Sequence, residues 1–191
     1  FRKSGKQDEK NIPVFLESIK SGVERATGIV QALNQFSRSH DTECEKCDIH
    51  SIIDNSLIIL SNLYKDRISI HKKYSKDPII INANVSKLIQ VFVNIVTNSI
   101  HAIEIRGEIT IQTQIKEGII EIEISDTGCG ISGENLTKIS DPFFTTKEPG
   151  KGTGLGLSIV YSIIHDYHGE MYFDSEPGKG TKVKIFLPAD S

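Results

Sequence analysis

The stretch that decides the fold is residues 90–102, QVFVNIVTNSIHA, an apolar run interrupted by Asn94 and Asn98. Residues 86–103 are apolar on most faces of a helix, which predicts a buried helix. The two asparagines are four residues apart, so they share one face. Because an unpaired buried amide costs about 1–3 kcal/mol, both side chains need partners. Their oxygens suit Mg²⁺, which usually arrives with phosphates; hydrogen bonds to backbone elsewhere in the fold are the alternative.

A motif with two spaced glycines follows, DTGCGI at residues 126–131, at the end of an expected strand. An aspartate at a strand end can accept a hydrogen bond from an exocyclic amine. Gly128 and Gly130 would let the backbone approach a flat ring. A tight turn that binds nothing is the alternative interpretation of this motif.

A glycine-rich loop, GKGTGLGLS at residues 150–158, runs directly into an expected helix. Such a loop exposes backbone N–H groups at a helix N-terminus, where the helix dipole favours an anion. The spacing fits neither a Walker motif nor a Rossmann fingerprint. Lys147 and Lys151 flank the loop and could neutralise phosphate charge, so a phosphate cradle is predicted, with a solvated charged loop as the alternative.

The remaining residues after position 43 alternate between strand and helix patterns. Helices are predicted over residues 51–63 and 155–167 as well as 86–103. Strands are predicted over the following ranges: residues 44–49, 68–74, 109–115, 120–124, 171–174 and 182–187. We expect an α/β fold of the α+β kind, a two-layer sandwich in which helices cover one face of a mixed, mainly antiparallel sheet.

The first 42 residues have a different pattern. Residues 11–38 place apolar side chains in steps of four and three, which is a heptad seam: Ile12, Leu16, Ile19, Val23, Ala26, Val30 and Leu33. The seam predicts one helix of a coiled coil or four-helix bundle across a dimer, rather than an amphipathic helix packed on its own domain. The pattern breaks at residues 39–43. We therefore divide the chain into a partial dimerisation helix, residues 1–42, and one α/β domain, residues 43–191.

Composition narrows the classes of function. The chain has 191 residues, 22 of them basic and 25 acidic, with a net charge of −3. That balance favours neither a nucleic-acid partner nor a membrane surface. No apolar run approaches the roughly 20 residues that span a bilayer. Because the first residue is not Met, we expect a fragment of a longer protein, whose other part could carry a membrane anchor.

Three cysteines are present. Cys44 and Cys47 form a Cys-x-x-Cys, and Cys129 stands alone. A structural zinc site usually takes four Cys or His ligands, and neither His40 nor His50 follows zinc-finger spacing. Plain strand or linker thiols are favoured over a zinc site or a redox pair, and the odd count suits a reducing cytoplasm.

Taken in order, the motifs resemble one ATPase superfamily. The order is paired asparagines on a helix, Asp-x-Gly-x-Gly, PFFTTK at residues 142–147, a glycine loop entering a helix, and GKGT at residues 178–181. The superfamily contains gyrase, the ninety-kilodalton heat-shock chaperones, histidine kinases and the mismatch-repair MutL proteins. The resemblance covers about residues 43–189. It implies the Bergerat ATP-binding fold, with residues 141–153 as a mobile lid over the nucleotide.

The resemblance implies roles residue by residue. Asp126 would bind adenine with support from Thr181. Asn94 and Asn98 would hold Mg²⁺ and the phosphates, and Asn94 and Lys147 would act in catalysis. The other ATP-binding residues that it implies are His101, Gly128, Gly130, Ile131, Phe143, Thr146, Lys151, Gly152, Thr153, Gly154, Leu155, Gly156 and Leu157.

Two features select the histidine kinases within the superfamily. The hydrolysing relatives carry, in place of Asn94, a glutamate that acts as base for water. Asparagine is a poor base, so the γ-phosphate is kept for another nucleophile. Residues 11–38 resemble the second helix of the kinase dimerisation domain. The resemblance implies transfer of the γ-phosphate of Mg-ATP to a histidine on a dimerisation helix of the same or a sister chain, then to a response-regulator receiver domain, in a homodimeric parent protein.

The chain departs from this family in two places. The phospho-acceptor histidine, followed by an acidic residue and Asn-x-Pro, does not occur in the sequence, so we expect the chain to bind ATP or ADP without autophosphorylating. Ser99 stands where the family usually has alanine, a change that we expect to be harmless. His101 either touches phosphate or is a plain helix-surface histidine. An ATP-hydrolysing superfamily member and a nucleotide-dependent dimerisation module are the alternative functions.

Overall fold

The computed structural model describes residues 43–147 and 152–189. A five-stranded sheet has the order β2 (Ile68–Lys73), β4 (Gly107–Lys116), β5 (Ile119–Asp126), β7 (Gly180–Pro188) and β6 (Glu170–Glu176). β2 and β4 run parallel, and every other neighbouring pair in this sheet is antiparallel. A separate antiparallel pair is formed by β1 (Glu45–Asp48) and β3 (Ile80–Ala83). The sheet is therefore mixed and mainly antiparallel, as predicted.

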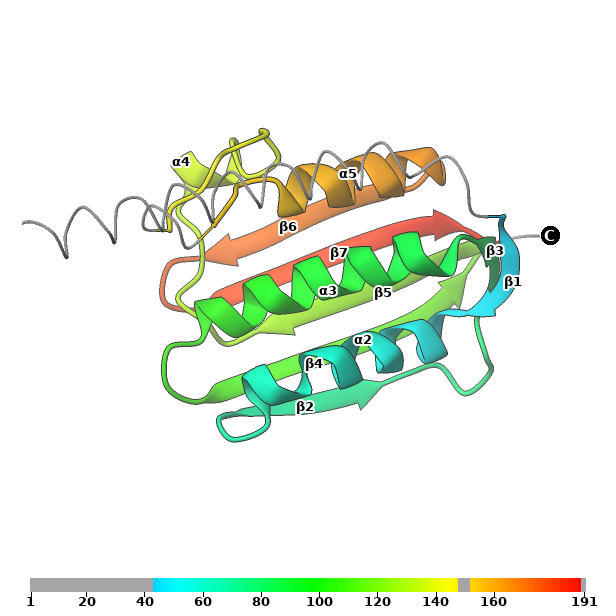
Figure 1. Ribbon diagram of the computed structural model, residues 1–191, viewed down its shortest axis with the longest axis horizontal. Helices are drawn as coiled ribbons and strands as arrows, with labels where there is room; N and C mark the ends of the chain where they lie inside the picture. Colours follow the sequence, from blue (N-terminus) through cyan, green and yellow to red (C-terminus); the bar gives the residue numbers. More distant parts are fainter. Residues whose placement is uncertain (1–42, 148–151, 190–191) are drawn as a thin grey trace, which may run out of the picture.

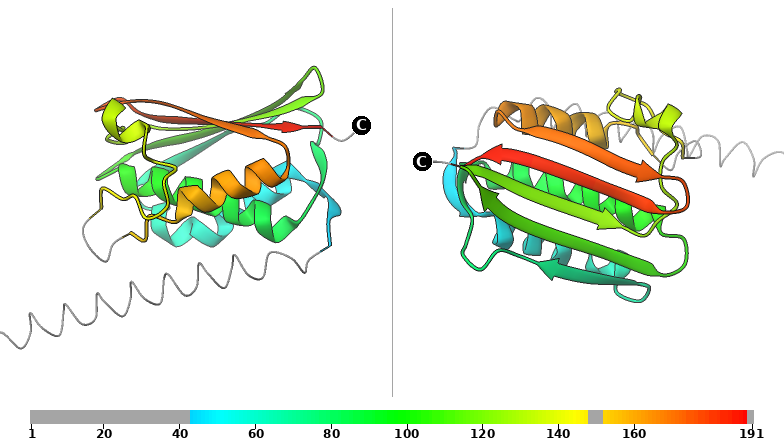
Figure 2. Two further views of the ribbon diagram at one scale, coloured as in Figure 1. Left: turned by 90° about the horizontal axis from the view of Figure 1, so that it is seen from above. Right: turned by 180° about the vertical axis from the view of Figure 1, so that it is seen from behind.

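The long helices form a single layer on one face of the large sheet. α2 (Ile49–Tyr64), α3 (Val85–Ala102) and α5 (Gly156–Asp166) lie side by side there, with α3 in the middle (Figure 1). Figure 2 shows that none of the described helices lies on the opposite face of the sheet, and that the single turn of α4 (Gly133–Leu136) lies at one end. The two-layer sandwich is thus confirmed. Within the described ranges, no helix combines the length and the apolar character needed to cross a membrane.

Side-chain caps set where α2 and α3 begin. The Asp48 carboxylate accepts hydrogen bonds from the backbone N–H groups of His50 at 3.2 Å and Ser51 at 3.3 Å. The Asn84 side chain accepts one from the N–H of Lys87 at 3.1 Å. Such caps satisfy N–H groups that the helix leaves free at its start. Each helix therefore begins one or two residues before the first residue of its periodic pattern.

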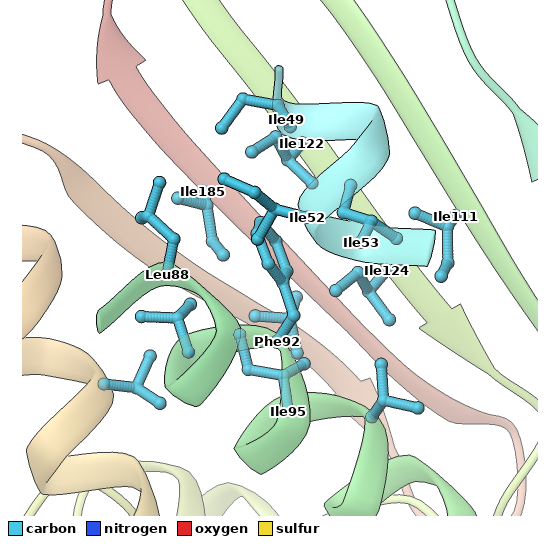
Figure 3. Packing of buried hydrophobic residues seen from close by; sticks show 14 of the residues in the cluster. Ile49, Ile52, Ile53, Leu88, Phe92, Ile95, Ile111, Ile122, Ile124 and Ile185 are labelled. Carbon is cyan, nitrogen blue, oxygen red and sulfur yellow. The ribbon is translucent and has the colours of Figure 1, made fainter. Parts of the chain in front are cut away.

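The core fixes the rotation of α3 against the sheet. Phe92 of α3 is 1% exposed and lies between α2 and the sheet, among isoleucines that include Ile53 and Ile122 (Figure 3). Burial of each such side chain contributes about 1.5–3 kcal/mol. With this face of the helix held against the sheet, Asn94 and Asn98 are only half-buried. The helix is buried as predicted, but its two asparagines face a cavity rather than the core.

Two short elements, β3 and α4, were not predicted from the sequence. The sequence of β3 shows no apolar–polar alternation, because Ile80, which is 48% exposed, is apolar like its buried neighbours Ile79 and Ile81. α4 is a single turn, capped by Ser132, which is too short to show helical periodicity. The predicted heptad helix, residues 11–38, lies outside the described residues.

Candidate functional site

A cavity of about 580 Å³ is lined by α3, α4, β6, β7, the end of β5 and the first turn of α5. That volume lies within the range of about 300–1,000 Å³ that is usual for small-molecule sites. The cavity is lined by the following predicted ligands: Asn94, Asn98, His101, Asp126, Gly130, Ile131, Thr146, Lys147, Gly152, Thr153, Gly154, Gly156, Leu157 and Thr181. Motifs that are distant in the sequence therefore meet at one place.

Asp126, the last residue of β5, is a buried carboxylate at one wall of this cavity. It is 8% exposed, and its Oδ1 accepts hydrogen bonds from the N–H of Gly128 at 2.9 Å and of Thr181 at 3.2 Å. Burial raises the pKa of this carboxyl, while hydrogen bonds from Gly128, the Ser99 hydroxyl and Thr181 act to lower it. These bonds hold the side chain in place, so it can accept a further hydrogen bond from a ligand.

The turn after Asp126 is packed tightly against the end of α3. The N–H of Cys129 donates to the carbonyl of Ala102 at 2.9 Å. A Cβ on Gly128 would lie 2.6 Å from the Ala102 Cβ, so no larger residue fits there without displacing the helix. This close approach ties the carboxylate to the helix that carries the two asparagines.

Asn94 and Asn98 line the cavity from neighbouring turns of α3. Asn94 lies against the first turn of α5, since a Cβ built on Gly156 would be 3.3 Å from the Asn94 Oδ1. Among the residues the structure describes, no buried side-chain nitrogen or oxygen lacks a hydrogen-bond partner. Because Asn94 and Asn98 are only half-buried, their side-chain amides do not need a partner within the protein, as fully buried amides would. Their position at the cavity makes them available to a bound ligand.

Lys147 and His101 form a polar pair at the cavity wall. The Lys147 Nζ lies 2.9 Å from the His101 Nδ1. Burial lowers the pKa of His101, and the positive charges of Lys147 and Arg67 lower it further, which favours the neutral imidazole. An ammonium only donates, so Nδ1 accepts and the ring hydrogen lies on Nε2. The pair offers a ligand one cation and one N–H donor.

The start of α5 is open to an anion. The N-cap residue of this helix, Leu155, makes no side-chain cap hydrogen bond. Helix N-termini leave N–H groups free, and the helix dipole adds partial positive charge there. Gly154 and Gly156 line the cavity at this point, and the Gly154 carbonyl accepts a hydrogen bond from the N–H of Phe143 at 2.9 Å. The predicted glycine loop therefore borders the same cavity as Asp126.

Three of the predicted ligands do not line the cavity. Phe143 is 58% exposed and has a positive φ of 69°, and the neighbouring Phe144 lines the cavity instead. Leu155 serves as the N-cap residue of α5. Gly128 donates its N–H to the carboxylate described above. Lys151 lies outside the described residues.

Other lining residues were not singled out in the sequence. They are Ile95, Ser99, Ala102, Cys129, Ser132, Asn135, Ile139, Phe144, Thr145, Phe173, Pro177 and Val183. Many are apolar, and a search for polar chemistry passes over them. Ser99 carried a signal, because a hydroxyl in an apolar helix directly after Asn98 needs a partner. Ser99 is 3% exposed, lines the cavity, and acts to lower the pKa of the Asp126 carboxyl, so it lies at the site.

The cysteines do not gather at one place. Cys47 lies in β1, Cys44 precedes that strand and Cys129 lines the cavity, all as free thiols. In the described part of the chain, no group of three or more His, Cys, Asp or Glu side chains could hold a metal ion.

Comparison with known proteins gives a consistent set of similarities. Residues 83–191 match a family model described as histidine kinase-, DNA gyrase B-, and HSP90-like ATPase. Sensor kinase CckA of Brucella abortus (strain 2308) is 37% identical over 186 residues, which make up 90% of this chain and 20% of that protein. This chain therefore spans about a fifth of the length of that curated relative.

Solved structures agree with the sequence matches. The catalytic domain of histidine kinase ThkA has a TM-score of 0.69 and 27% identity, covering 78% of this chain and 97% of that one. ThkA in complex with response regulator protein TrrA has a TM-score of 0.74 and 22% identity, covering 100% of this chain and 53% of that one. The second likeness is one of fold.

Proposed function

The chain belongs to the family of histidine kinase-, DNA gyrase B- and HSP90-like ATPases, and from that premise we propose that it supplies the nucleotide-binding half of a two-component sensor kinase. In the parent protein, the bond between the γ-phosphorus and ADP breaks as a bond to a histidine nitrogen forms. The phosphoryl group then passes to a response-regulator receiver domain, and ThkA has been solved in complex with response regulator protein TrrA.

The observation that carries this proposal is a single cavity lined by two chemically different groups of residues. Asp126 offers a fixed hydrogen-bond acceptor, which suits the exocyclic amine of adenine. The uncapped start of α5 and the Lys147 ammonium offer positive charge, which suits phosphates. A nucleotide has both parts, a flat base and an anionic chain, so it suits both groups of residues that line the cavity.

Asn94 and Asn98 suit Mg²⁺ that arrives with the nucleotide. Each has a carboxamide oxygen, a hard ligand, and Mg²⁺ at phosphate sites usually takes only one or two protein ligands. When bound there, the ion neutralises phosphate charge. The chain's own contribution is to orient the phosphates without placing beside them a side chain that would act as a base toward water. Asn94 is not a base, and the His101 Nδ1 already accepts from Lys147.

The direct test is incubation of the chain with ATP labelled at the γ-phosphate. We expect ADP or ATP at about a hundred times its dissociation constant to add about 2.7 kcal/mol to the free energy of unfolding. We expect no stable acid-labile label on the chain itself, because the acceptor motif does not occur in its sequence. Stable label on this chain alone would contradict the second expectation, and an unchanged melting temperature would contradict the first.

Replacement of Asn94 tests why the γ-phosphate is kept from water. Asn94→Glu places a carboxylate where the hydrolysing relatives carry one, so we expect ATP hydrolysis to rise by about tenfold. That is below the roughly 10²–10⁴-fold of a well-positioned base. Asn94→Gln is the matched control, with the same chain length as glutamate but no basic oxygen. Equal hydrolysis by both variants would favour a true ATPase whose base lies elsewhere.

The heptad seam of residues 11–38 supports a homodimeric parent in which this helix pairs with another dimerisation helix. The three free thiols, Cys44, Cys47 and Cys129, support a reducing cytoplasm for this part of the protein.

A further inference from the structure

Ser175 lies behind the wall of the cavity that Asp126 and Thr181 form, and no motif pointed to it. It faces Thr181 across the β6–β7 pair. Its Oγ lies 2.8 Å from the N–H nitrogen of Ile131, 2.9 Å from the carbonyl oxygen of Gly180 and 2.9 Å from the Thr181 Oγ1. One hydroxyl therefore contacts three neighbouring segments of the site.

The directions of these hydrogen bonds follow from what each group can donate. A serine hydroxyl has one hydrogen and two acceptor lone pairs. A carbonyl only accepts, so the hydrogen of Ser175 goes to Gly180. The N–H of Ile131 only donates and takes one lone pair. The remaining lone pair accepts from Thr181, whose own hydrogen is thereby turned away from the cavity.

This arrangement controls what the wall offers a ligand. Thr181 lines the cavity beside Asp126, and with its hydrogen committed to Ser175 it presents only lone pairs. The other hydroxyl at this wall, that of Ser99, acts to lower the pKa of Asp126, as a hydroxyl turned toward a carboxylate does. The Thr181 hydroxyl, by contrast, has its hydrogen committed to a group outside the cavity. An amine on the edge of a bound base can donate a hydrogen bond to the acceptors at this wall. A carbonyl at the same place would set its oxygen lone pairs against those of Asp126 and Thr181, with no hydrogen between them.

We propose that Ser175 is a specificity-determining positioning residue, which fixes the Thr181 hydroxyl as an acceptor and so makes the cavity select a 6-aminopurine over a 6-oxopurine nucleotide. Ser175 does not touch the nucleotide and acts through Thr181. The inference rests on the proposed nucleotide binding at Asp126 and adds the group that sets its base selectivity.

The test compares ADP with inosine diphosphate, which carries an oxygen in place of the 6-amino group. Calorimetric dissociation constants are measured for the whole chain and for Ser175→Ala. The variant frees the Thr181 hydroxyl to donate to that oxygen, so we expect the preference for ADP to fall by about tenfold, equivalent to about 1.4 kcal/mol. Ser175→Thr keeps a hydroxyl on the strand and is expected to retain the preference. Ser125→Ala, on the outward face of β5 next to Asp126, is the matched control and should change nothing.

A double-mutant cycle separates this role from a merely structural one. In a Thr181→Val background there is no hydroxyl left to orient, so Ser175→Ala should no longer change the ratio of the two dissociation constants. If Ser175→Ala does not fold, as judged by circular dichroism, Ser175→Cys replaces it, because a thiol keeps the volume but is a weak hydrogen-bonding group.

The outcomes distinguish the two proposals. If Ser175→Ala weakens both nucleotides equally, or changes neither, the selectivity role is wrong while nucleotide binding stands. If the effect on the ratio persists in the Thr181→Val background, Ser175 does not act through Thr181 and the inference is overturned. If the unchanged chain binds neither nucleotide, the proposed function fails and this inference fails with it.

Discussion

Asp126→Asn is expected to weaken ADP binding by at least about 100-fold while leaving the nucleotide-free chain at least as stable at neutral pH. Asparagine can keep an oxygen for the N–H groups of Gly128 and Thr181. It then presents an NH₂ group where the second carboxylate oxygen was. Donor would face donor at the adenine amine, and sites built to hydrogen-bond a group reject an analogue without the match by about 10⁴–10⁵, so a loss of at least about 100-fold is expected.

The stability of the same variant depends on pH in a defined direction. Burial raises the pKa of Asp126 above its usual 3.8. The folded chain therefore holds the proton more tightly than the unfolded chain, and ionisation of Asp126 lowers the free energy of unfolding. This loss is absent below the unfolded pKa, develops as pH rises through the folded pKa, and is complete at neutral pH. Asp126→Asn removes it, so the variant's relative stability should increase from acid to neutral pH.

Melting temperatures with and without ADP, measured between pH 4 and pH 8, check both parts. Asp174→Asn makes the same chemical change at an exposed position of β6 and serves as the control. Its ADP-induced shift should match that of the unchanged chain. An intact ADP-induced shift in Asp126→Asn would show that the base does not bind at this carboxylate.

Local sequence patterns pointed to most of the polar residues that line the cavity. Asp126, Asn94 and the glycine loop each belong to a short motif that left an alternative open by itself, and the order of the motifs along the chain, through its resemblance to one superfamily, predicted that they act together. The strands β4 and β5 were likewise clear from strict alternation. What spacing could not supply was the direction of single side chains. Phe143 and Phe144 are adjacent and identical in chemistry, yet Phe144 lines the cavity while Phe143 is exposed and has a positive φ.

Contacts between distant segments were the other gap. Ser99 is 27 positions before its partner Asp126, and Ser175 bonds to the backbone of Ile131 across 44 positions. Neither pairing follows from periodicity, because each depends on how α3 and β6 meet the end of β5 and the loop after it in the folded chain. Ser99 was therefore expected to be a harmless substitution. The structure places it against the carboxylate that we propose reads the base.

Gly180→Ala is expected to be the most destabilising single substitution tested, with a loss of more than about 4 kcal/mol in the free energy of unfolding. Gly180 opens β7 with a φ of 93°, and a Cβ there would lie 1.9 Å from the carbonyl oxygen of Asp126. That atom is backbone in the neighbouring strand and cannot move aside as a side-chain tip would. The two strands must separate where Thr181 pairs with Asp126.

Two other glycines separate the causes of this effect. Gly178 has a φ of 78° but nothing within 4 Å of a built Cβ, so Gly178→Ala should cost only the roughly 1–2 kcal/mol of a left-handed residue. Gly133 has open space and no positive φ, so Gly133→Ala should be close to neutral. Urea unfolding of the three variants gives the comparison directly. Equal losses for Gly180→Ala and Gly178→Ala would show that φ alone matters and that the strands tolerate the contact.

The same substitution links the packing of the β5–β7 strand pair to the binding site. Separation of β5 and β7 at Gly180 would move the N–H of Thr181 away from Asp126 Oδ1, one of the two backbone bonds that hold the carboxylate. At temperatures where Gly180→Ala is still folded, we therefore expect its ADP affinity to fall as well, whereas Gly178→Ala should bind ADP as the unchanged chain does. Unaltered ADP affinity in folded Gly180→Ala would mean that the carboxylate keeps its position without the strand pairing.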